Sequence, residues 1–237
     1  MKPAERIIVA LDADDRAKAL QIVTACAGRV GALKVGKELF TAEGPAIVRE
    51  IVAAGGRVFL DLKYHDIPTT VKGACRAAAS LGAFMLNVHA AGGRKMIAAA
   101  REGLDSAGAR RPLLLAVTVL TSIDAATLRD EVRIPHSPLE QVVFWARMAA
   151  ESGADGVVCA PTEIAAVREV CGREFLIVTP GVRPAWAGVD DQKRIMTPAE
   201  AVAAGADYLV IGRPITRAAD MAAAAGRIAD EIAGAGR

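Results

Sequence analysis

The chain has 237 residues and a net charge of +2, with its basic and acidic residues interspersed. It therefore lacks the long basic stripe that marks many nucleic-acid-binding proteins. The hydrophobic fraction is 53% but aromatic residues make up only 4%, so a core must be built mainly from Ala, Val, Ile and Leu.

The N-terminal segment, residues 1–6, leads directly into a five-residue apolar stretch that is too short for the core of a signal peptide. No apolar run approaches the roughly 18 residues that a transmembrane helix needs. The four cysteines are widely spaced and form no Cys-x-x-Cys pair. We therefore expect a soluble, cytoplasmic protein with reduced thiols and no membrane partner.

Eight short apolar runs follow along the chain and are predicted to be buried β-strands. They are Ile7–Leu11, Ala32–Gly36, Val58–Leu62, Phe84–Val88, Leu113–Val119, Gly156–Ala160, Phe175–Thr179 and Tyr208–Gly212. Eight segments with helical patterning alternate with them, namely Arg16–Cys26, Ala46–Ala54, Thr69–Leu81, Arg94–Ala107, Leu139–Glu151, Thr162–Val170, Pro198–Ala204 and Ile215–Ile232.

This alternation predicts an α/β protein with a parallel sheet. Eight repeats in 237 residues favour a closed (β/α)8 barrel, a TIM barrel, over an open doubly wound sheet. The glycines after the first strand do not form Gly-x-Gly-x-x-Gly, which weakens a dinucleotide-binding interpretation. No linker interrupts the pattern, so residues 1–237 are predicted to form a single domain whose active site lies at the C-terminal ends of the strands.

The third strand carries the densest group of charges. Asp61 and Lys63 fall on the same face because strand side chains alternate with period two, and Asp66 follows where the chain should turn. A charge on a buried strand is costly unless it is paired, hydrated or functional. We predict that these three groups gather in one small volume as an active site; a structural ion pair between Asp61 and Lys63 is the alternative.

Other predicted strands also end in polar side chains, namely Asp12, Lys34, Asn87, His89, Thr118, Thr121 and Ser122. Four of these residues have a plainer interpretation. Asp12 is placed to cap the next helix. Lys34 is placed to form only an ion pair or to extend its ammonium from the strand into water. Thr121 is placed to cap a turn, and for His89 a hydrogen-bonded packing role is favoured over that of a base.

The loops after the last two strands have the features of a phosphate site. In this fold these loops, together with a helix N-terminus, commonly hold phosphate. Arg183 and Gln192 lie in the seventh loop, and Gly212 with Arg213 opens the last helix. The alternative is that Arg183 and Arg213 only cap carbonyl groups or pair with surface carboxylates.

Metal binding has little support in the sequence. No cluster of histidines and carboxylates has convincing ligand spacing. Asp61 and Asp66 are oxygen donors of the type that Mg²⁺ takes, but the neighbouring lysine ammoniums argue against a cation there.

Taken together, these motifs resemble the orotidine 5'-monophosphate decarboxylase family of the bacterial type, through nearly the whole chain. The resemblance rests on Val9–Asp12, Leu33–Gly36, Asp61–Pro68 with Thr70, Asn87–Ala90, Val117–Ser122, Pro180–Pro184, Asp191–Arg194 and Ile211–Ile215. The Asp-x-Lys-x-x-Asp core is shared with related Mg²⁺-dependent barrels. The Ile-Pro-x-Thr extension and the Gly-Val-Arg-Pro loop followed by Asp-Gln are more specific.

The resemblance implies decarboxylation of orotidine 5'-monophosphate to uridine 5'-monophosphate, in pyrimidine biosynthesis, with no cofactor. It implies that Lys63 donates a proton to C6 and that Asp61 lies beside the departing carboxylate. It also implies that Lys34 and Asp12 bind the ribose and complete the charged array, with Lys34 among the catalytic residues. Thr121 would contact the pyrimidine, and the phosphate would be held by Arg183, Gln192, Gly212 and Arg213. It also implies a homodimer in which Asp66, a further catalytic residue, and Thr70 reach the neighbouring subunit's site.

Two other functions stay open at this point. One is a Mg²⁺-dependent sugar-phosphate decarboxylase or aldolase on the same barrel, which does not need a pyrimidine-side loop with Gln192. The other is a sensor that binds a phosphorylated ligand without turnover. Phosphate binding alone would not require Asp61 and Lys63, which argues against a sensor.

Overall fold

The computed structural model describes residues 1–187 and 196–234. Eight parallel strands form a closed barrel in sequence order, and β1 closes it by pairing with β8. The strands are β1 (Ile7–Leu11), β2 (Ala32–Gly36), β3 (Val58–Tyr64), β4 (Met85–His89), β5 (Leu113–Val117), β6 (Gly156–Val158), β7 (Leu176–Pro180) and β8 (Tyr208–Ile211). This confirms the predicted barrel.

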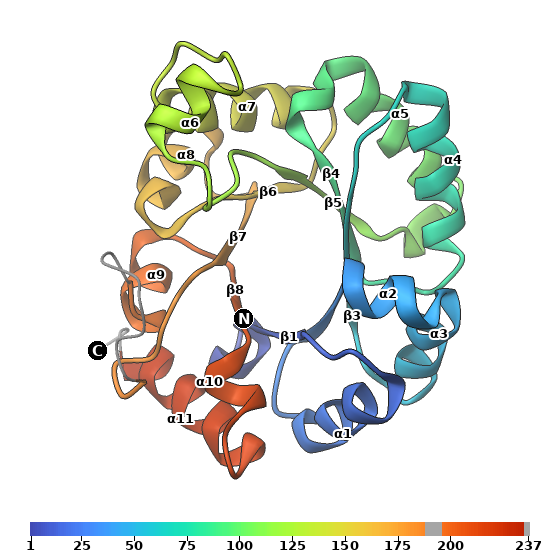
Figure 1. Cartoon of the computed structure of the whole chain (residues 1–237), viewed down its shortest axis with the longest axis vertical. Coiled ribbons are helices and arrows are strands. Elements are labelled where there is room, and N and C mark those ends of the chain that lie inside the picture. Colours follow the sequence, from blue (N-terminus) through green and yellow to red (C-terminus); the bar gives the residue numbers. More distant parts are fainter. Residues whose placement is uncertain (188–195, 235–237) are drawn as a thin grey trace.

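Helices surround the outside of the barrel, as Figure 1 shows. They are α1 (Arg16–Cys26), α2 (Lys37–Glu43), α3 (Pro45–Ala53), α4 (Pro68–Ala79), α5 (Gly93–Asp105), α6 (Ala125–Asp130), α7 (Pro138–Glu151), α8 (Ile164–Cys171), α9 (Pro198–Ala204), α10 (Arg213–Thr216) and α11 (Met221–Gly234). Short 3₁₀ turns are η1 (Pro3–Arg6), η2 (Ala90–Gly92), η3 (Gly108–Arg110) and η4 (Pro161–Glu163). Across these described elements, none of the helices has the length and apolar character that crossing a membrane requires.

Alternation along the strands divides the core into two layers. Side chains that point outward pack under the helices in one large cluster. Those that point inward form a second cluster of Ile8, Ala32, Phe59, Met85, Leu115, Val178 and Tyr208. The interior of the barrel is therefore a packed core, and a ligand must bind above it, at the ends of the strands.

The helical pattern differs from the prediction in three places. The short helix α2 follows β2 directly and ends at Gly44, whose φ of 65° suits a glycine. α6 is an additional helix, capped by the Asp124 side chain, which accepts the Thr127 N–H. The single helix expected over Ile215–Ile232 is two helices, because Asp220 accepts the Ala223 N–H and starts α11 anew.

β3 is longer than expected and irregular. It extends to Tyr64, and its register against β4 shifts between Leu60 and Tyr64. Within the shifted stretch Lys63 has a φ of 54°, in the left-handed region that residues with a Cβ rarely adopt. A bulge of this kind redirects a side chain, and bulges are frequent beside active sites.

Candidate active site

Four charged side chains form a row across the ends of the first three strands. Lys63 Nζ lies 2.6 Å from Asp61 Oδ1, and Lys34 Nζ lies 3.4 Å from Asp61 Oδ2. The Lys34 ammonium is also 3.5 Å from Asp12 Oδ1, which extends the row to β1. The charges alternate in sign along it, so that each lysine contacts a carboxylate.

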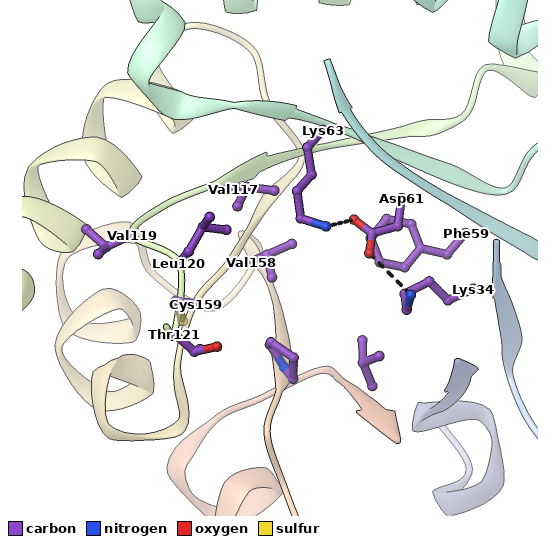
Figure 2. Close-up of a pocket in the computed structure, with 12 residues that line it drawn as sticks. Lys34, Phe59, Asp61, Lys63, Val117, Val119, Leu120, Thr121, Val158 and Cys159 are labelled. Atoms are coloured by element: carbon purple, nitrogen blue, oxygen red, sulfur yellow. Dashed lines mark hydrogen bonds and ion pairs between the residues drawn. The ribbon is translucent and has the colours of Figure 1, made fainter. Parts of the chain in front are cut away.

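Asp61 is at the centre of this row and is buried, with 9% of its surface exposed. Figure 2 shows its carboxylate between the ammonium groups of Lys63 and Lys34. A third donor, the Asn87 amide, reaches Asp61 Oδ1 at 2.7 Å. These three donors compensate the cost of burying a carboxylate. They also occupy both oxygens, which leaves Asp61 a poor ligand for a divalent cation.

A cavity of about 220 Å³ opens beside the charged row. Lys34, Asp61 and Lys63 form its charged edge, and the rest of its wall is mainly apolar, made by Phe59, Val117, Val119, Leu120, Thr121, Val158, Cys159, Pro180 and Val210. An ammonium at the edge of an apolar cavity interacts strongly with negative charge because little water screens it. The site is therefore suited to stabilising an anion and to delivering a proton to it.

Two glycines leave space for the polar groups of the row. A Cβ on Gly36 would come within 3.2 Å of Lys34 Nζ, and one on Gly212 within 3.4 Å of Asp12 Oδ2. Gly212 also stands directly before α10, where Arg213 begins the helix. The predicted phosphate-site glycine thus lies beside the predicted ribose-binding Asp12, although 200 residues separate them in sequence.

The alternatives for Asp12 and Thr121 are not what the structure shows. The N-cap of α1 is Asp15, which accepts the Lys18 N–H, and not Asp12. Asp124, and not Thr121, caps α6. Thr121 lines the cavity and lies across it from Asp61 (Figure 2).

The arginines of the last two loops differ in their surroundings. Arg183 is half-buried, and its backbone N–H donates to the Met196 carbonyl at 3.1 Å, whereas Arg213 is exposed. Within residues 1–187 and 196–234, neither guanidinium pairs with a carboxylate or caps a carbonyl group. As far as these residues go, both positive charges are available to an anionic ligand. Gln192 lies outside the described residues.

His89 ends β4 beside the charged row. Its ring centroid is 5.6 Å from that of His65. Burial lowers its pKa to about 4, and the nearby positive charges of His65, Lys63 and Lys37 contribute further. His89 is therefore neutral near pH 7.

Asp66 does not join Asp61 and Lys63 in the isolated chain, contrary to the expectation that the three share one small volume. Asp66 is exposed, does not line the cavity and accepts the N–H of Ile67 at 2.6 Å. Thr70 is likewise exposed, and Ile67 between them has 64% of its surface exposed. Lys34 and Asp12, which the resemblance placed in the charged array, do lie beside Asp61.

The described residues contain no group of three or more His, Cys, Asp or Glu side chains placed to hold a metal ion. Cys26, Cys75 and Cys159 are buried, and burial raises the pKa of all three thiols. These three cysteines are therefore packing residues, whereas the fourth, Cys171, is half-buried.

The comparison with known families agrees with this geometry. A family model for orotidine 5'-phosphate decarboxylase / HUMPS matches residues 5–228. The chain belongs to this family. The match covers every strand of the barrel and each residue of the charged row.

Within the family, the similar curated relatives are orotidine 5'-phosphate decarboxylases. The one from Moorella thermoacetica is 56% identical over 236 residues, which cover 98% of this chain and 94% of the relative. The one from Halorhodospira halophila is 58% identical over 231 residues, covering 98% and 97%. A crystal structure of orotidine 5'-phosphate decarboxylase from Lactobacillus acidophilus has a TM-score of 0.86 and 42% identity, and covers 95% of this chain and 98% of that one.

Sequence reasoning on this decarboxylase-family barrel missed the role of Asn87. The residue was recognised as polar at a strand end, but nothing marked it as a neighbour of Asp61 and Lys63. The contact depends on the register of β4 against β3, which a single sequence does not give. The only available signal was its place on the same barrel face as the charged residues.

Proposed function

We propose that this protein decarboxylates orotidine 5'-monophosphate to uridine 5'-monophosphate, in pyrimidine biosynthesis, and that it needs no cofactor. The curated relatives that carry this activity in their names match almost the whole chain. The observation that carries the proposal is the Lys63 ammonium, 2.6 Å from Asp61 at the edge of an apolar cavity. A cation is needed there because loss of CO₂ from C6 leaves a carbanion that the pyrimidine ring delocalises poorly.

In the proposed reaction the substrate carboxylate lies beside Asp61 and C6 faces Lys63. The bond from C6 to the carboxyl carbon breaks, its electron pair stays on C6, and CO₂ departs. Lys63 then gives a proton to C6, and solvent restores the ammonium. Asp61 keeps Lys63 charged and oriented, and its negative charge repels the substrate carboxylate, although ground-state repulsion of this kind is a contested source of catalysis.

One ammonium does not account for the whole rate enhancement. At about 4 Å and an effective dielectric constant near 20 it contributes roughly 4 kcal/mol. Enzymes commonly lower barriers by about 8–23 kcal/mol. The remainder must come from exclusion of water and from binding energy at parts of the substrate that do not react.

The phosphate is the natural source of that binding energy. We assign it to Arg183, Gln192, Gly212 and Arg213, with Asp12 and Lys34 on the ribose and Thr121 on the pyrimidine edge. The support is that both guanidiniums lack an ion pair among the described residues, while Gly212 adjoins Asp12. We also assign Asp66 and Thr70 to the neighbouring subunit's site in a homodimer.

The test is the loss of orotidylate ultraviolet absorbance in EDTA. Wild type should turn over without added metal, whereas Lys63→Ala should lose at least about 10³-fold in kcat, because it loses both the cation and the proton donor. Lys2→Ala, an exposed lysine in the segment before β1, is the matched control and should keep wild-type activity.

Three other results of this assay would contradict part or all of the proposal. Full activity of Lys63→Ala would contradict the role of Lys63. Turnover that requires added Mg²⁺ would favour the sugar-phosphate lyase. Tight binding of uridine 5'-monophosphate without turnover of orotidylate would favour a sensor.

A further inference from the structure

Asn87 on β4 contacts both residues at the centre of the proposed chemistry but does not line the cavity. We propose that Asn87 is a positioning residue that holds Lys63 and Asp61 in their reactive geometry. This inference rests on the proposed decarboxylation, because it assigns a role within that site.

The Asn87 amide makes two hydrogen bonds in opposite directions. Its Nδ2 donates to Asp61 Oδ1 at 2.7 Å, and its Oδ1 accepts the backbone N–H of Lys63 at 2.8 Å. With 1% of its surface exposed, the side chain has little access to water as a substitute partner. The two bonds also fix the orientation of the amide, since a flipped amide would place its oxygen against the carboxylate.

The hydrogen bond to the Lys63 N–H stabilises an irregular stretch of the β3 backbone. The register shift between Leu60 and Tyr64 takes Lys63 out of the regular ladder, and its φ is 54°. Such a conformation persists in a residue with a Cβ only where its surroundings hold it. The Asn87 carbonyl oxygen provides the acceptor that the ladder no longer supplies.

The hydrogen bond to Asp61 holds the other member of the Lys63–Asp61 ion pair. Asp61 Oδ1 receives both Asn87 Nδ2 and the Lys63 ammonium. Asn87 therefore fixes the carboxylate and the backbone of the lysine that contacts it. Loss of Asn87 should let Lys63 relax toward ordinary strand geometry and move its ammonium, which lowers kcat. The phosphate-binding loops lie on other strands, so KM should change less than kcat.

Asn87→Asp provides a test with a pH signature. The substituted side chain has nearly the same shape and accepts the Lys63 N–H, but once ionised it cannot donate to Asp61 and repels it. When protonated it has a donor and an acceptor, as the amide does. We expect kcat about 10²-fold below wild type near pH 8. The ratio of variant to wild type should rise several-fold as the pH falls to about 6, because burial and Asp61 favour the protonated form.

Asn87→Leu removes both hydrogen bonds at similar volume and allows a test without turnover. Exchange of the Lys63 backbone amide with deuterium, measured by NMR or mass spectrometry, should be faster in Asn87→Leu than in wild type. Thr118→Val is the matched control, because it also removes a buried bond, from Thr118 Oγ1 to the Val158 carbonyl at 2.8 Å. The control should leave Lys63 exchange and kcat within about threefold of wild type.

The outcomes separate the two proposals. Wild type that does not decarboxylate orotidylate would overturn the proposed function, while amide exchange would still test the Asn87 contact. The positioning role fails if Asn87→Leu leaves Lys63 exchange or kcat at the wild-type level. It also fails if the ratio of Asn87→Asp to wild type is the same at both pH values. Should Asn87→Leu not fold, the Asn87→Asp profile decides alone.

Discussion

The charged row is neutral when its four residues are taken together. Asp12 and Asp61 balance Lys34 and Lys63, and each contact joins opposite charges. A neutral row acts strongly on a group within a few ångströms and weakly on a distant one, because the fields of opposite charges cancel. The negative charge of a bound phosphate must therefore be met elsewhere, as the proposed role of the loop arginines requires.

His89 leads to a prediction on pH and stability. Its pKa falls from the ordinary 6.5 to about 4 in the folded protein, so the folded state binds fewer protons than the unfolded chain between these values. The resulting stabilisation is present above pH 6.5 and is lost as the pH falls through about 4. We expect the free energy of unfolding in urea to fall less steeply over this range in His89→Gln than in wild type. Equal slopes would show that His89 is not held neutral.

For single residues, the sequence predicted which face of a strand a side chain lies on better than it predicted which residues that side chain contacts. Period two correctly placed Asp61 and Lys63 together, and their ammonium–carboxylate contact is confirmed. The bulge at Lys63 was not predicted, because alternation says nothing about an irregular ladder. Asp66 was grouped with them on sequence distance alone, and the turn after β3 carries it to the exposed surface.

Among the elements, helix α11 supports the segment that follows β7. The Trp186 ring lies under the Arg227 guanidinium, with 4.1 Å from Cζ to the ring centroid. One turn further along α11, Glu231 accepts the Ala185 N–H at 3.4 Å. These contacts fix the chain just after Arg183, the residue assigned to the substrate phosphate.

We therefore expect Arg227→Ala to weaken substrate binding without altering the chemical step. An exposed cation–π contact contributes about 0.5–1 kcal/mol, which corresponds to a KM roughly two- to fivefold higher at similar kcat. Steady-state kinetics on orotidylate would measure both constants. Arg49→Ala, an exposed arginine on α3, is the control and should match wild type. A drop in kcat with unchanged KM would contradict this role for α11.

The strands were predictable from the sequence, whereas the short helices α2 and α6 in the loops between strands and main helices were not. Continuous runs of Val, Ile and Leu identify strands buried on both faces, and their number gave the barrel. α2 and α6 are short, and their sequences lack a long apolar period. α10 and α11 had merged in the prediction because both are helical and only the Asp220 cap separates them.

For the whole molecule, the exposed stretch after β3 supports the proposed homodimer. His65, Asp66, Ile67 and Thr70 are all exposed in the isolated chain, and Ile67 is a large apolar residue. A second copy of the chain over this surface would bury Ile67. It would also give Asp66 and Thr70 a site to enter, which they lack in their own subunit.

Mixing two inactive variants tests this arrangement. In a heterodimer of Lys63→Ala with Asp66→Ala, one site receives Lys63 from one subunit and Asp66 from the other. Equal mixing with full subunit exchange should restore about a quarter of wild-type activity, since half of the dimers are mixed and each has one intact site. If Asp66 serves its own subunit, every site lacks one residue and no activity returns. Each variant assayed alone provides the baseline.

The closure of the barrel by β1 and β8 makes the ligand site depend on both ends of the chain. Asp12 follows the first strand and Gly212 the last, and they become neighbours only when Ile7–Val9 pairs with Leu209–Ile211. Lys34, Asp61 and Lys63 belong to the second and third strands, but the site that also includes Asp12 and Gly212 is complete only when the last strand is in place. In the proposed function, activity therefore depends on the last strand, and a chain shortened to end before Tyr208 should not turn over orotidylate.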